Sequence, residues 1–452
     1  MTGIPLIIAF VVAVVLMIIA ISKWKVHPFL SIMGVSVLLA LVAGIPLTDV
    51  PGVIGAGFSG TFSSIGIVII LGALIGSILE QTGAALKLAD MVVKLVGKKN
   101  PELALELMGW VVPIPVFCDS GFVILDPIRK ALVKRTGSSS VAATVALSAG
   151  LYISHVFIPP TPGPIAAANT LGIGDNLLLV IGLGVLCSIF PLAAGLVYAK
   201  FIGKKVKSKD ELVEAGEVVK TYEELVAGYG KLPGGFNALA PIIVPVILMA
   251  LGTIGKQLGV TGFALNLLTF LGTPIISLAV GTIFAIAQLA IAKKMGEFYK
   301  ITNDTLKTVG PILFVTAAGG VLGKVISSTT MVAYITENAN FLMNLGIFFP
   351  FLLAAILKTA QGSSTVAITT TAGIMAPMMV SLGLGTPALG ALTVMAIGAG
   401  AMTVSHANDS YFWVVTNFGE MTPDQGYKTQ TILTLVMGIA SIIGIFLVSL
   451  FF

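Results

Sequence analysis

The sequence contains very little charge. Of its 452 residues, only 10% are Asp, Glu, Lys or Arg, and 56% are hydrophobic. Soluble domains carry about a quarter charged residues, so this composition cannot cover an ordinary water-exposed surface. The 51 glycines and 22 prolines are spread through the apolar stretches, and both residues are more frequent in membrane helices than in soluble ones. The composition excludes a soluble globular protein and predicts an integral membrane protein.

Residues that build cross-links and metal sites are also scarce. The two cysteines, Cys118 and Cys187, are too few for a disulfide framework. The three histidines are far apart and no H-E-x-x-H motif occurs, so we expect no metal site. The absence of a Walker-type loop removes ATP as an energy source within this chain. We expect no cofactor. The net charge is only +5, and the basic residues cluster in short loops, so we expect no nucleic-acid partner either.

The sequence does not predict an enzyme. Residues 172–175 resemble the Gly-x-Gly-Asp motif of intramembrane aspartyl proteases, but no Tyr-Asp partner motif is present. An intramembrane hydrolase needs an activated nucleophile, and neither motif nor spacing supplies one. A channel is a further alternative, which would need a continuous pore and would show uncoupled flux that does not saturate.

Long apolar runs divide the chain into membrane segments of about 20 residues each. The predicted spans are 4–22, 27–47, 62–80, 139–157, 175–201, 239–256, 264–292, 307–327, 341–358, 386–404 and 429–452. Shorter apolar pieces lie at 84–96, 100–118, 120–135, 163–173, 363–382 and 408–419. These pieces are too short to span, so they are candidates for re-entrant or interfacial segments. The sequence predicts an all-α polytopic protein of a cytoplasmic-type (inner) membrane.

Basic residues predict the orientation of the segments. They cluster at Lys23/Lys25, Lys94/Lys98/Lys99, Lys204/Lys205/Lys207/Lys209 and Lys293/Lys294. By the positive-inside rule these clusters face the cytoplasm, which places the N-terminus outside. The charged stretch 204–235 is then a central cytoplasmic loop between two halves.

Related landmarks recur in the two halves. In the same order, residues 72–76 correspond to 319–323, 117–121 to 361–365, and 154–155 to 405–406. The predicted spans 62–80 and 307–327 cross in opposite directions, so we interpret the duplication as an inverted repeat, an arrangement common in secondary transporters. The predicted division is 1–60 scaffold spans, 61–203 first repeat, 204–238 cytoplasmic linker, 239–306 scaffold spans, 307–428 second inverted repeat and 429–452 C-terminal span.

The first polar break of the sequence surrounds Asp119. Two prolines at 113 and 115 interrupt the approaching helix, so that Asp119 lies where a helix restarts, followed by Ser120 and Gly121. Free amides at a helix start attract anions, and the Asp119 carboxylate could take up a proton. The alternative is that Asp119 only caps the helix 120–135, with Asp126 and Arg129 paired on its surface.

The second break is a strip rich in proline, residues 154–164. Four of the six residues from Pro159 to Pro164 are proline, which excludes regular helix. The strip is either a stiff surface loop or an ordered segment that lines a cavity, to which His155 and Thr161 would contribute. A single histidine is also compatible with a purely structural role.

The third and fourth breaks lie in the second half. Gln361 and Gly362 interrupt an apolar run rich in hydroxyl groups, so that residues 363–365 can present amides and hydroxyls together. Alternatively, such hydroxyls bond back to helix carbonyls. Residues 405–410 include His406, Asn408 and Asp409. Ionisable groups at membrane depth mark solute or proton pathways, but an external loop or an N-cap for 410–419 is the alternative.

These motifs resemble the gluconate permease family of secondary transporters, within the larger ion-transporter group. The similarity covers nearly the whole chain and rests on Phe117-Cys118-Asp119-Ser120-Gly121-Phe122, Pro159-Pro160-Thr161-Pro162-Gly163-Pro164, Ala360-Gln361-Gly362-Ser363-Ser364-Thr365-Val366-Ala367 and Ser405-His406-Ala407-Asn408-Asp409-Ser410. It implies proton-coupled uptake of gluconate or a related acid, and a homodimeric elevator-type carrier. Some gluconate carriers have histidine where this chain has Thr161. That departure puts substrate and coupling in doubt and makes Na⁺ coupling less remote.

We therefore predict a symporter that binds a small anionic solute between the breaks. The predicted substrate-binding residues are Asp119, Ser120, Gly121, Thr161, Gln361, Gly362, Ser363, Ser364, Thr365 and Asn408. The predicted proton carriers are Asp119, His155, His406 and Asp409. The alternative substrates are D-serine, glycerate or 3-hydroxybutyrate, with Na⁺ as the alternative coupling ion.

Overall fold

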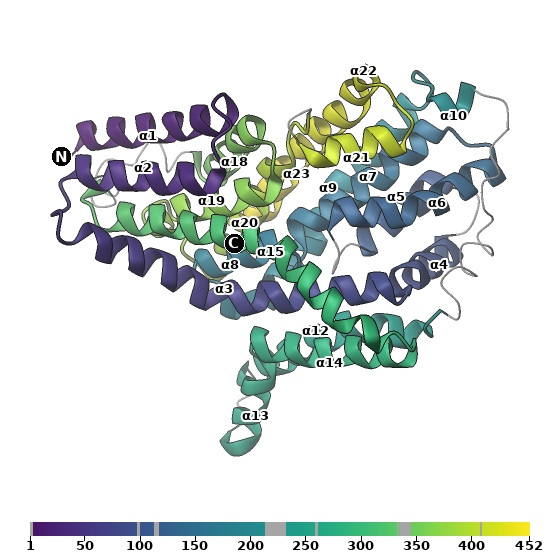
Figure 1. Ribbon diagram of the computed structural model, residues 1–452, viewed down its shortest axis with the longest axis horizontal. Helices are drawn as coiled ribbons and strands as arrows, with labels where there is room; N and C mark the ends of the chain where they lie inside the picture. The colour runs from purple at the N-terminus through teal and green to yellow at the C-terminus, as the bar shows by residue number, and fades with distance from the viewer. Residues whose placement is uncertain are drawn as a thin grey trace.

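The chain folds into helices that pack side by side along the long axis of the molecule (Figure 1). The computed structural model describes residues 3–452 except 97–99, 113–116, 213–231, 258–260, 332–333, 335–344 and 407–408. All regular elements in the described residues are helical, which confirms the predicted all-α class. The described stretches long and apolar enough to cross a membrane are Ser140–Thr170, Gly174–Ile202, Gly235–Gly252, Pro274–Ile291, Met295–Ser327 and Pro423–Ser449.

The helices of the first half are α1 (Ile4–Ser22), α2 (Pro28–Ala43), α3 (Val50–Gln81), α4 (Ala84–Val96), α5 (Pro101–Val111), α6 (Cys118–Thr136), α7 (Ser140–Phe157), α8 (Pro162–Thr170), α9 (Leu177–Ile202) and α10 (Lys209–Leu212). Those of the second half are α12 (Gly235–Gln257), α13 (Gly262–Gly272), α14 (Pro274–Ile291), α15 (Phe298–Ser327), α18 (Phe348–Gln361), α19 (Ser364–Met375), α20 (Pro387–Met402), α21 (Ser410–Phe418), α22 (Pro423–Gly426) and α23 (Ile432–Ser449).

Two helices made largely of small residues, α7 and α20, form the buried centre. Every residue of α7 is buried, and α20 is buried from Gly390 onward. Glycines bring their neighbours close: a Cβ on Gly150 would lie 2.7 Å from the amide nitrogen of Trp110 in α5. A Cβ on Gly400 would lie 2.8 Å from the Cβ of Ala354 in α18. Small residues at helix crossings allow this close packing, which is the usual basis of helix association in membranes.

The long helices α3 and α15 pack against each other in opposite directions. Near the start of α3, a Cβ on Gly57 would lie 2.7 Å from the Cα of Val321, late in α15. Near the end of α3, Ser77 accepts a 2.8 Å hydrogen bond from Thr305, early in α15. An inverted duplication requires this antiparallel relation of the two corresponding spans. The domain boundaries drawn from the sequence remain a prediction.

The packing of the two halves follows one pattern. Helix α5 packs on α7 as α18 packs on α20, and α7 packs on α9 as α20 packs on α23. Each half also reaches into the other, because α8 packs on α19 and α21 packs on α6. The short helices after each chain break are therefore held between elements of both halves.

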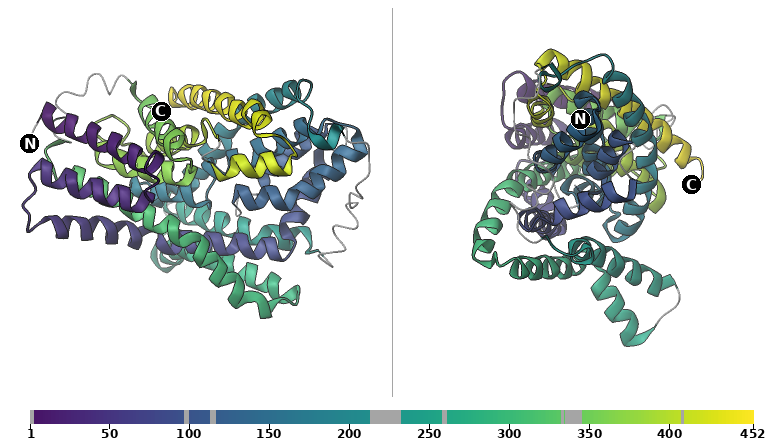
Figure 2. Two further views of the ribbon diagram at one scale, coloured as in Figure 1. Left: turned by 45° about the horizontal axis from the view of Figure 1, so that its top comes forward. Right: turned by 90° about the vertical axis from the view of Figure 1, so that its right-hand side faces the viewer.

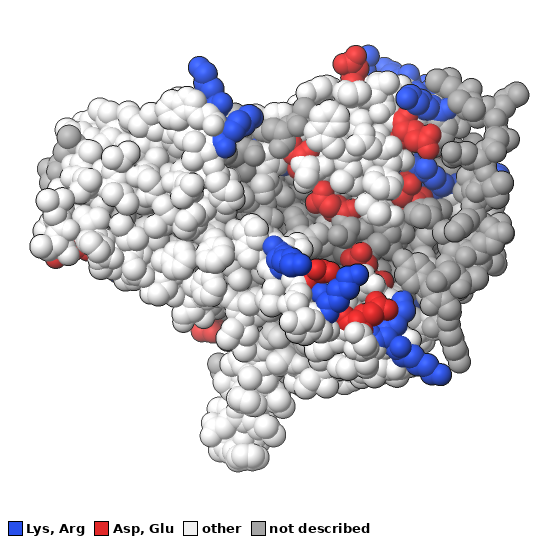
Figure 3. All heavy atoms as spheres, in the orientation of Figure 1, with Lys and Arg blue, Asp and Glu red and all other residues white. Residues whose placement is uncertain are grey.

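A separate group of helices, α12 to α14, lies along α3 at the edge of the molecule. Figures 1 and 2 both show α13 projecting from the body. Its aromatic residues Phe263 and Phe270 are 80% and 55% exposed. Figure 3 shows almost no charged side chains on α13, at the bottom of the view, or at the left end of the molecule, where α1 and α2 lie. The charged side chains on this face gather mainly in its right half. Apolar surfaces of this kind are suited to contact with lipid.

Several local expectations need correction. The predicted span 62–80 is only the later part of α3, which begins at Val50. The proline strip is irregular only at 158–161, because Pro162 occupies the first turn of α8, where its missing amide hydrogen costs nothing. Most of the predicted cytoplasmic linker, 213–231, lies outside the described residues. The orientation of the N-terminus remains a prediction.

The pair Asp126 and Arg129 is not on the surface, as the alternative interpretation of α6 supposed. Arg129 is fully buried, and its Nε donates a 2.6 Å hydrogen bond to Asp126. It also donates to the Ser140 hydroxyl at 2.7 Å and to the Phe418 carbonyl at 3.2 Å. The pair therefore ties α6 to the start of α7 and the end of α21.

Candidate functional site

A cavity of about 350 Å³ lies where the chain breaks of both halves meet. Its lining includes the first turns of α2, α6, α19 and α21, together with His155 of α7 and one side of α15 around Pro311. The peptide dipoles of a helix make its N-terminus electropositive, and its first amides lack partners within the helix. The cavity is therefore surrounded by groups that favour an anion.

The break between α18 and α19 arises from local sequence. Gly362 adopts the left-handed conformation with φ of 89°, which ends α18 and is natural for glycine. Ser363 then caps α19 by accepting a 3.3 Å hydrogen bond from the amide of Val366. Ser363, Ser364 and Thr365 all line the cavity. These three residues therefore lie where hydroxyls and helix-start amides can both reach the cavity. Their contact with a solute stays a prediction.

Helix α6 begins at the cavity without a side-chain cap. Phe117 is extended at the N-cap position, and the first helical bond runs from the Gly121 amide to the Phe117 carbonyl at 2.8 Å. Asp119 is half-buried in the first turn, and its Oδ2 accepts a 3.8 Å hydrogen bond from the Cys118 thiol. Its Oδ1 is buried and accepts no hydrogen bond from the residues that the structure describes. Asp119 thus brings a carboxylate to the cavity wall that is less fully bonded than that of Asp409.

The break between α20 and α21 is organised around Asp409. Its Oδ2 accepts hydrogen bonds from Ser405 at 2.5 Å, from Lys358 at 2.6 Å and from Tyr152 at 3.3 Å. Its Oδ1 caps α21 by accepting from the Tyr411 amide at 3.1 Å. Lys358 is fully buried. The carboxylate is therefore held in a buried ion pair and fully engaged.

The two predicted histidines occupy different environments. His155 lines the cavity and is 4% exposed, and within the described part of the chain its Nδ1 has no hydrogen-bond partner. Its ring lies beside those of Phe117 and Tyr152. His406 is half-buried away from the cavity lining, and its Nε2 lies 3.0 Å from the Thr359 carbonyl oxygen. Of these two, only His155 belongs to the described lining of the cavity, which also includes His27 at the start of α2.

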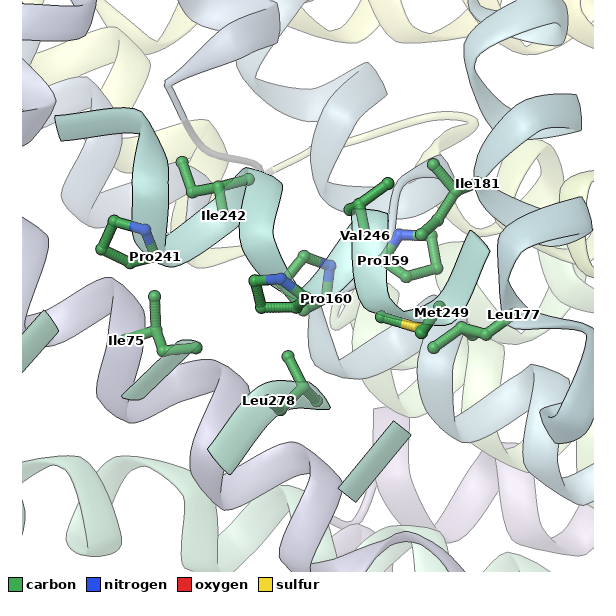
Figure 4. Close-up of a pocket in the computed structure, with 11 residues that line it drawn as sticks. Ile75, Pro159, Pro160, Leu177, Ile181, Pro241, Ile242, Val246, Met249 and Leu278 are labelled. Carbon is green, nitrogen blue, oxygen red and sulfur yellow. The ribbon is translucent and has the colours of Figure 1, made fainter. Parts of the chain in front are cut away.

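The proline strip turns toward other helices. Thr161 is buried at the start of α8 and donates a 2.6 Å hydrogen bond to the Ile158 carbonyl, outside the cavity lining. Pro159 and Pro160 line an apolar pocket of about 10 Å³ together with residues of α12 such as Pro241 (Figure 4). That volume holds about one water molecule and no solute. The strip is therefore ordered and buried, in contact with the helices at the molecular edge.

The structure gathers at the cavity six of the predicted site residues: Asp119, His155, Ser363, Ser364, Thr365 and Asp409. Ser120 and Gly121 lie in the first turn of α6, Gln361 ends α18, and Gly362 follows it. The side chains of Ser120 and Gln361, and all of Asn408, lie outside the described residues. The assignment of these positions to substrate binding or proton coupling stays a prediction.

Sequence reasoning missed four residues at or beside the cavity: His27, Lys358, Tyr152 and Tyr411. The signal for Lys358 was available, since a lysine inside an apolar run three residues before a helix break is costly without a partner. Neither tyrosine carried a comparable signal. Tyr152 contacts Asp409 only because α7 packs beside the break before α21, and residues so far apart in sequence meet through tertiary packing.

A second cavity, of about 210 Å³, lies between α3 and α15. Its lining includes Glu80, Lys300 and Asp304. Phe117 and Thr308 line both this cavity and the one at the helix starts. The second cavity is therefore a polar vestibule adjoining the first, with Phe117 at the boundary.

Comparison with known proteins identifies the family. The sequence model of the family described as GntP family permease matches residues 4–451. An uncharacterized permease of Haemophilus influenzae is 34% identical over 427 residues, covering 92% of this chain and 86% of that protein. The low-affinity gluconate transporter of Escherichia coli K12 is 30% identical over 451 residues, covering 98% of each.

A solved structure has the same fold. The YdaH transporter of Alcanivorax borkumensis, described as having an unusual topology, matches with a TM-score of 0.61 at 15% sequence identity. The match covers 94% of this chain and 97% of that one. The chain belongs to the GntP permease family, whose members are named as permeases and transporters rather than enzymes, and it is a multi-pass membrane protein.

Proposed function

We propose that this protein imports gluconate or a related small hydroxy acid together with a proton. The observation that carries the proposal is the convergence of the α6, α19 and α21 starts on one cavity. Half-helix starts that point at the anionic group of a substrate are a general device of secondary transporters. The cavity volume of about 350 Å³ lies within the range of small-molecule sites.

The solute's carboxylate binds at the helix starts in this proposal. Uncapped amides of α6 and the hydroxyls of Ser364 and Thr365 supply hydrogen bonds to it. No lysine or arginine belongs to the described lining of the cavity. Backbone dipoles and hydroxyls therefore replace a fixed cation as the anion-binding group, which permits release as well as binding.

The charges around the cavity favour a proton as the coupling ion. Lys358 balances the charge of Asp409 through their ion pair, whereas Asp119 has no such partner at its Oδ1. An ionised Asp119 would repel a bound carboxylate, and protonation removes that repulsion. Asp119 is therefore the carrier that we propose among the predicted candidates.

A second candidate substrate is a zwitterion such as D-serine. The unpartnered Oδ1 of Asp119 favours it, because an ionised carboxylate could accept a hydrogen bond from the ammonium group of the amino acid. In that case Asp119 stays ionised and another group, or Na⁺, provides the coupling. Glycerate and 3-hydroxybutyrate fit the first scheme, with Asp119 protonated.

Uptake by purified protein in liposomes tests the proposal. Labelled gluconate is supplied with and without an inward proton gradient, and unlabelled glycerate, 3-hydroxybutyrate and D-serine serve as competitors. Saturable accumulation driven by the gradient supports the proposal. If only D-serine is taken up, the substrate is the zwitterion and not gluconate. If uptake does not saturate and the solute does not accumulate, the proposal of a coupled carrier is rejected.

The proposal also includes a homodimer with elevator-type movement, as the family resemblance implies. The arm formed by α12 to α14 would belong to the stationary scaffold, since it lies at the edge of the molecule (Figure 2). Cross-linking between cysteines placed on α8 and α12 would test the movement. A cross-link that forms in every transport state and leaves uptake unchanged would reject it.

A further inference from the structure

We propose that Lys358 is a tethered cation that occupies a small-cation site of the carrier, so that transport needs no Na⁺. The proposal rests on the function proposed above and specifies the ion requirement of the same site. It predicts that shortening Lys358 uncovers a site at which a free small cation restores transport.

The groups around the Lys358 ammonium are those that bind a hard cation. Its Nζ donates to the carbonyl of Gly362 and to Oδ2 of Asp409 at 2.6 Å. The Ser405 hydroxyl is bonded to the same Asp409 oxygen. Carbonyl, carboxylate and hydroxyl oxygens are the ligands that hard cations prefer. The ammonium also lies 5.7 Å from the centre of the Tyr152 ring, within cation–π range.

These oxygens come from the two places where helices are interrupted. Gly362 follows α18, and its carbonyl is freed from the helix because the chain leaves the helical path there. Ser405 and Asp409 lie between α20 and α21. Unwound carbonyls and half-helix ends are where transporters coordinate their coupling cation. Lys358 reaches this position from the last turn of α18.

Lys358 is not placed to hold the substrate. It is fully buried, and the described lining of the cavity includes Asp409 but not Lys358. Both partners of its ammonium are protein groups. The positive charge of Lys358 therefore balances the negative charge of Asp409. Without it, Asp409 would be an unpaired carboxylate next to the bound anionic solute. The other ionisable side chains of the described cavity wall make no hydrogen bond to Lys358; they are His27, Cys118, Asp119, His155 and Tyr411.

A purely structural lysine would behave differently. If Lys358 only joins α18 to the break before α21, its removal lowers stability and transport, and no free cation reverses the loss. If its ammonium fills a cation site, the vacated oxygens bind Na⁺ or a small alkylammonium ion. The two roles are separated by the response of a shortened variant to added cations.

The experiment compares the wild type, Lys358→Ala and the surface control Lys23→Ala in proteoliposomes. Uptake of labelled gluconate is measured in choline, sodium and ethylammonium chloride at constant ionic strength. The wild type and Lys23→Ala should transport equally in all three salts. Lys358→Ala should be about tenfold or more slower in choline, because one partner of a buried ion pair is missing. Sodium or ethylammonium should restore its uptake in a saturable manner.

A double variant, Lys358→Met with Asp409→Asn, removes both charges and should show no response to cations. Stimulation of the wild type by Na⁺, or a monodisperse Lys358→Ala that responds to no cation, overturns the proposal. If Lys358→Ala unfolds in choline, it should be recovered by purification in sodium or ethylammonium chloride, and failure in every salt also overturns it. No uptake of any acid by the wild type would instead reject the proposed function.

Discussion

If Asp119 carries the coupling proton as proposed, replacing it by Asn should separate substrate binding from coupling. The substitution keeps the size of the side chain and removes its charge, as protonation does. In the wild type, Asp119 lines the cavity, and its buried Oδ1 accepts no hydrogen bond from the described residues. A bound hydroxy acid brings a second negative charge into the same space. The variant should therefore bind the anion as the protonated wild type does, at every pH.

The size of the effect follows from the geometry. A sphere with the cavity volume of about 350 Å³ is about 9 Å across, so the two carboxylates lie on the order of 6 Å apart. At an effective dielectric constant of about 20, unit charges at that distance repel by about 3 kcal/mol. That energy corresponds to roughly a hundredfold in affinity.

The assay is the pH dependence of gluconate KM in proteoliposomes. As the pH rises and Asp119 loses its proton, the KM of the wild type should increase, by up to roughly a hundredfold between full protonation and full ionisation. The KM of Asp119→Asn should stay at the low-pH value of the wild type. The variant should equilibrate gluconate but not accumulate it, because it carries no proton.

Two controls sharpen the test. Asp119→Glu keeps a titratable group and should retain accumulation. Asp175→Asn changes an exposed carboxylate outside the described cavity lining and should behave as the wild type. If Asp119→Asn accumulates gluconate with the pH dependence of the wild type, the charge argument fails. Complete loss of gluconate binding would also contradict it, because the variant should bind as the protonated wild type does.

Three further predictions concern other parts of the site and its support. In Gly323→Ala, the added Cβ would lie 2.5 Å from a carbonyl oxygen of α19, so thermal unfolding in detergent should show a loss of about 1–3 kcal/mol. Gly310→Ala on the same helix meets nothing within 4 Å and should be neutral. Ser363→Ala removes the N-cap of α19 at the cavity, which should cost about 1 kcal/mol of stability and raise the gluconate KM. As a control, Thr386→Ala removes the N-cap of α20 and should lower stability while leaving KM unchanged. His406→Gln should keep the wild-type pH dependence of uptake, since this histidine lies outside the described cavity lining. If the variant loses that pH dependence, His406 is a proton carrier after all.

Local sequence was sufficient to locate the helix breaks. Gly362 followed by Ser363 ends one helix and caps the next, because a left-handed glycine and a serine cap act within a few residues of the chain. The restart of a helix near Asp119 was predictable for the same reason. The membrane class followed from the scarcity of charge, since that depends on composition and not on the path of the chain.

Other features could not be predicted locally. The interpretation of Asp126 and Arg129 as a surface pair was wrong because α21 and α7 cover them. The sequence of α6 alone does not show that these two helices pack on it. The proline strip 154–164 was expected to be irregular, and the structure restricts the irregular part to 158–161. The side toward which it faces depended on the packing of α12, which lies more than sixty residues later in the chain.

The sequence by itself determined that the protein is helical, membrane-embedded and interrupted at four polar sites, because composition, glycine, proline and capping residues act locally. Only the tertiary structure decided which breaks share a cavity and which charges are compensated. Lys358 lies in the last turn of α18 and Asp409 is the N-cap of α21, 51 positions later, yet they form one buried ion pair. Long-range pairing depends on how helices cross, and the close crossings made possible by buried small residues place these breaks together.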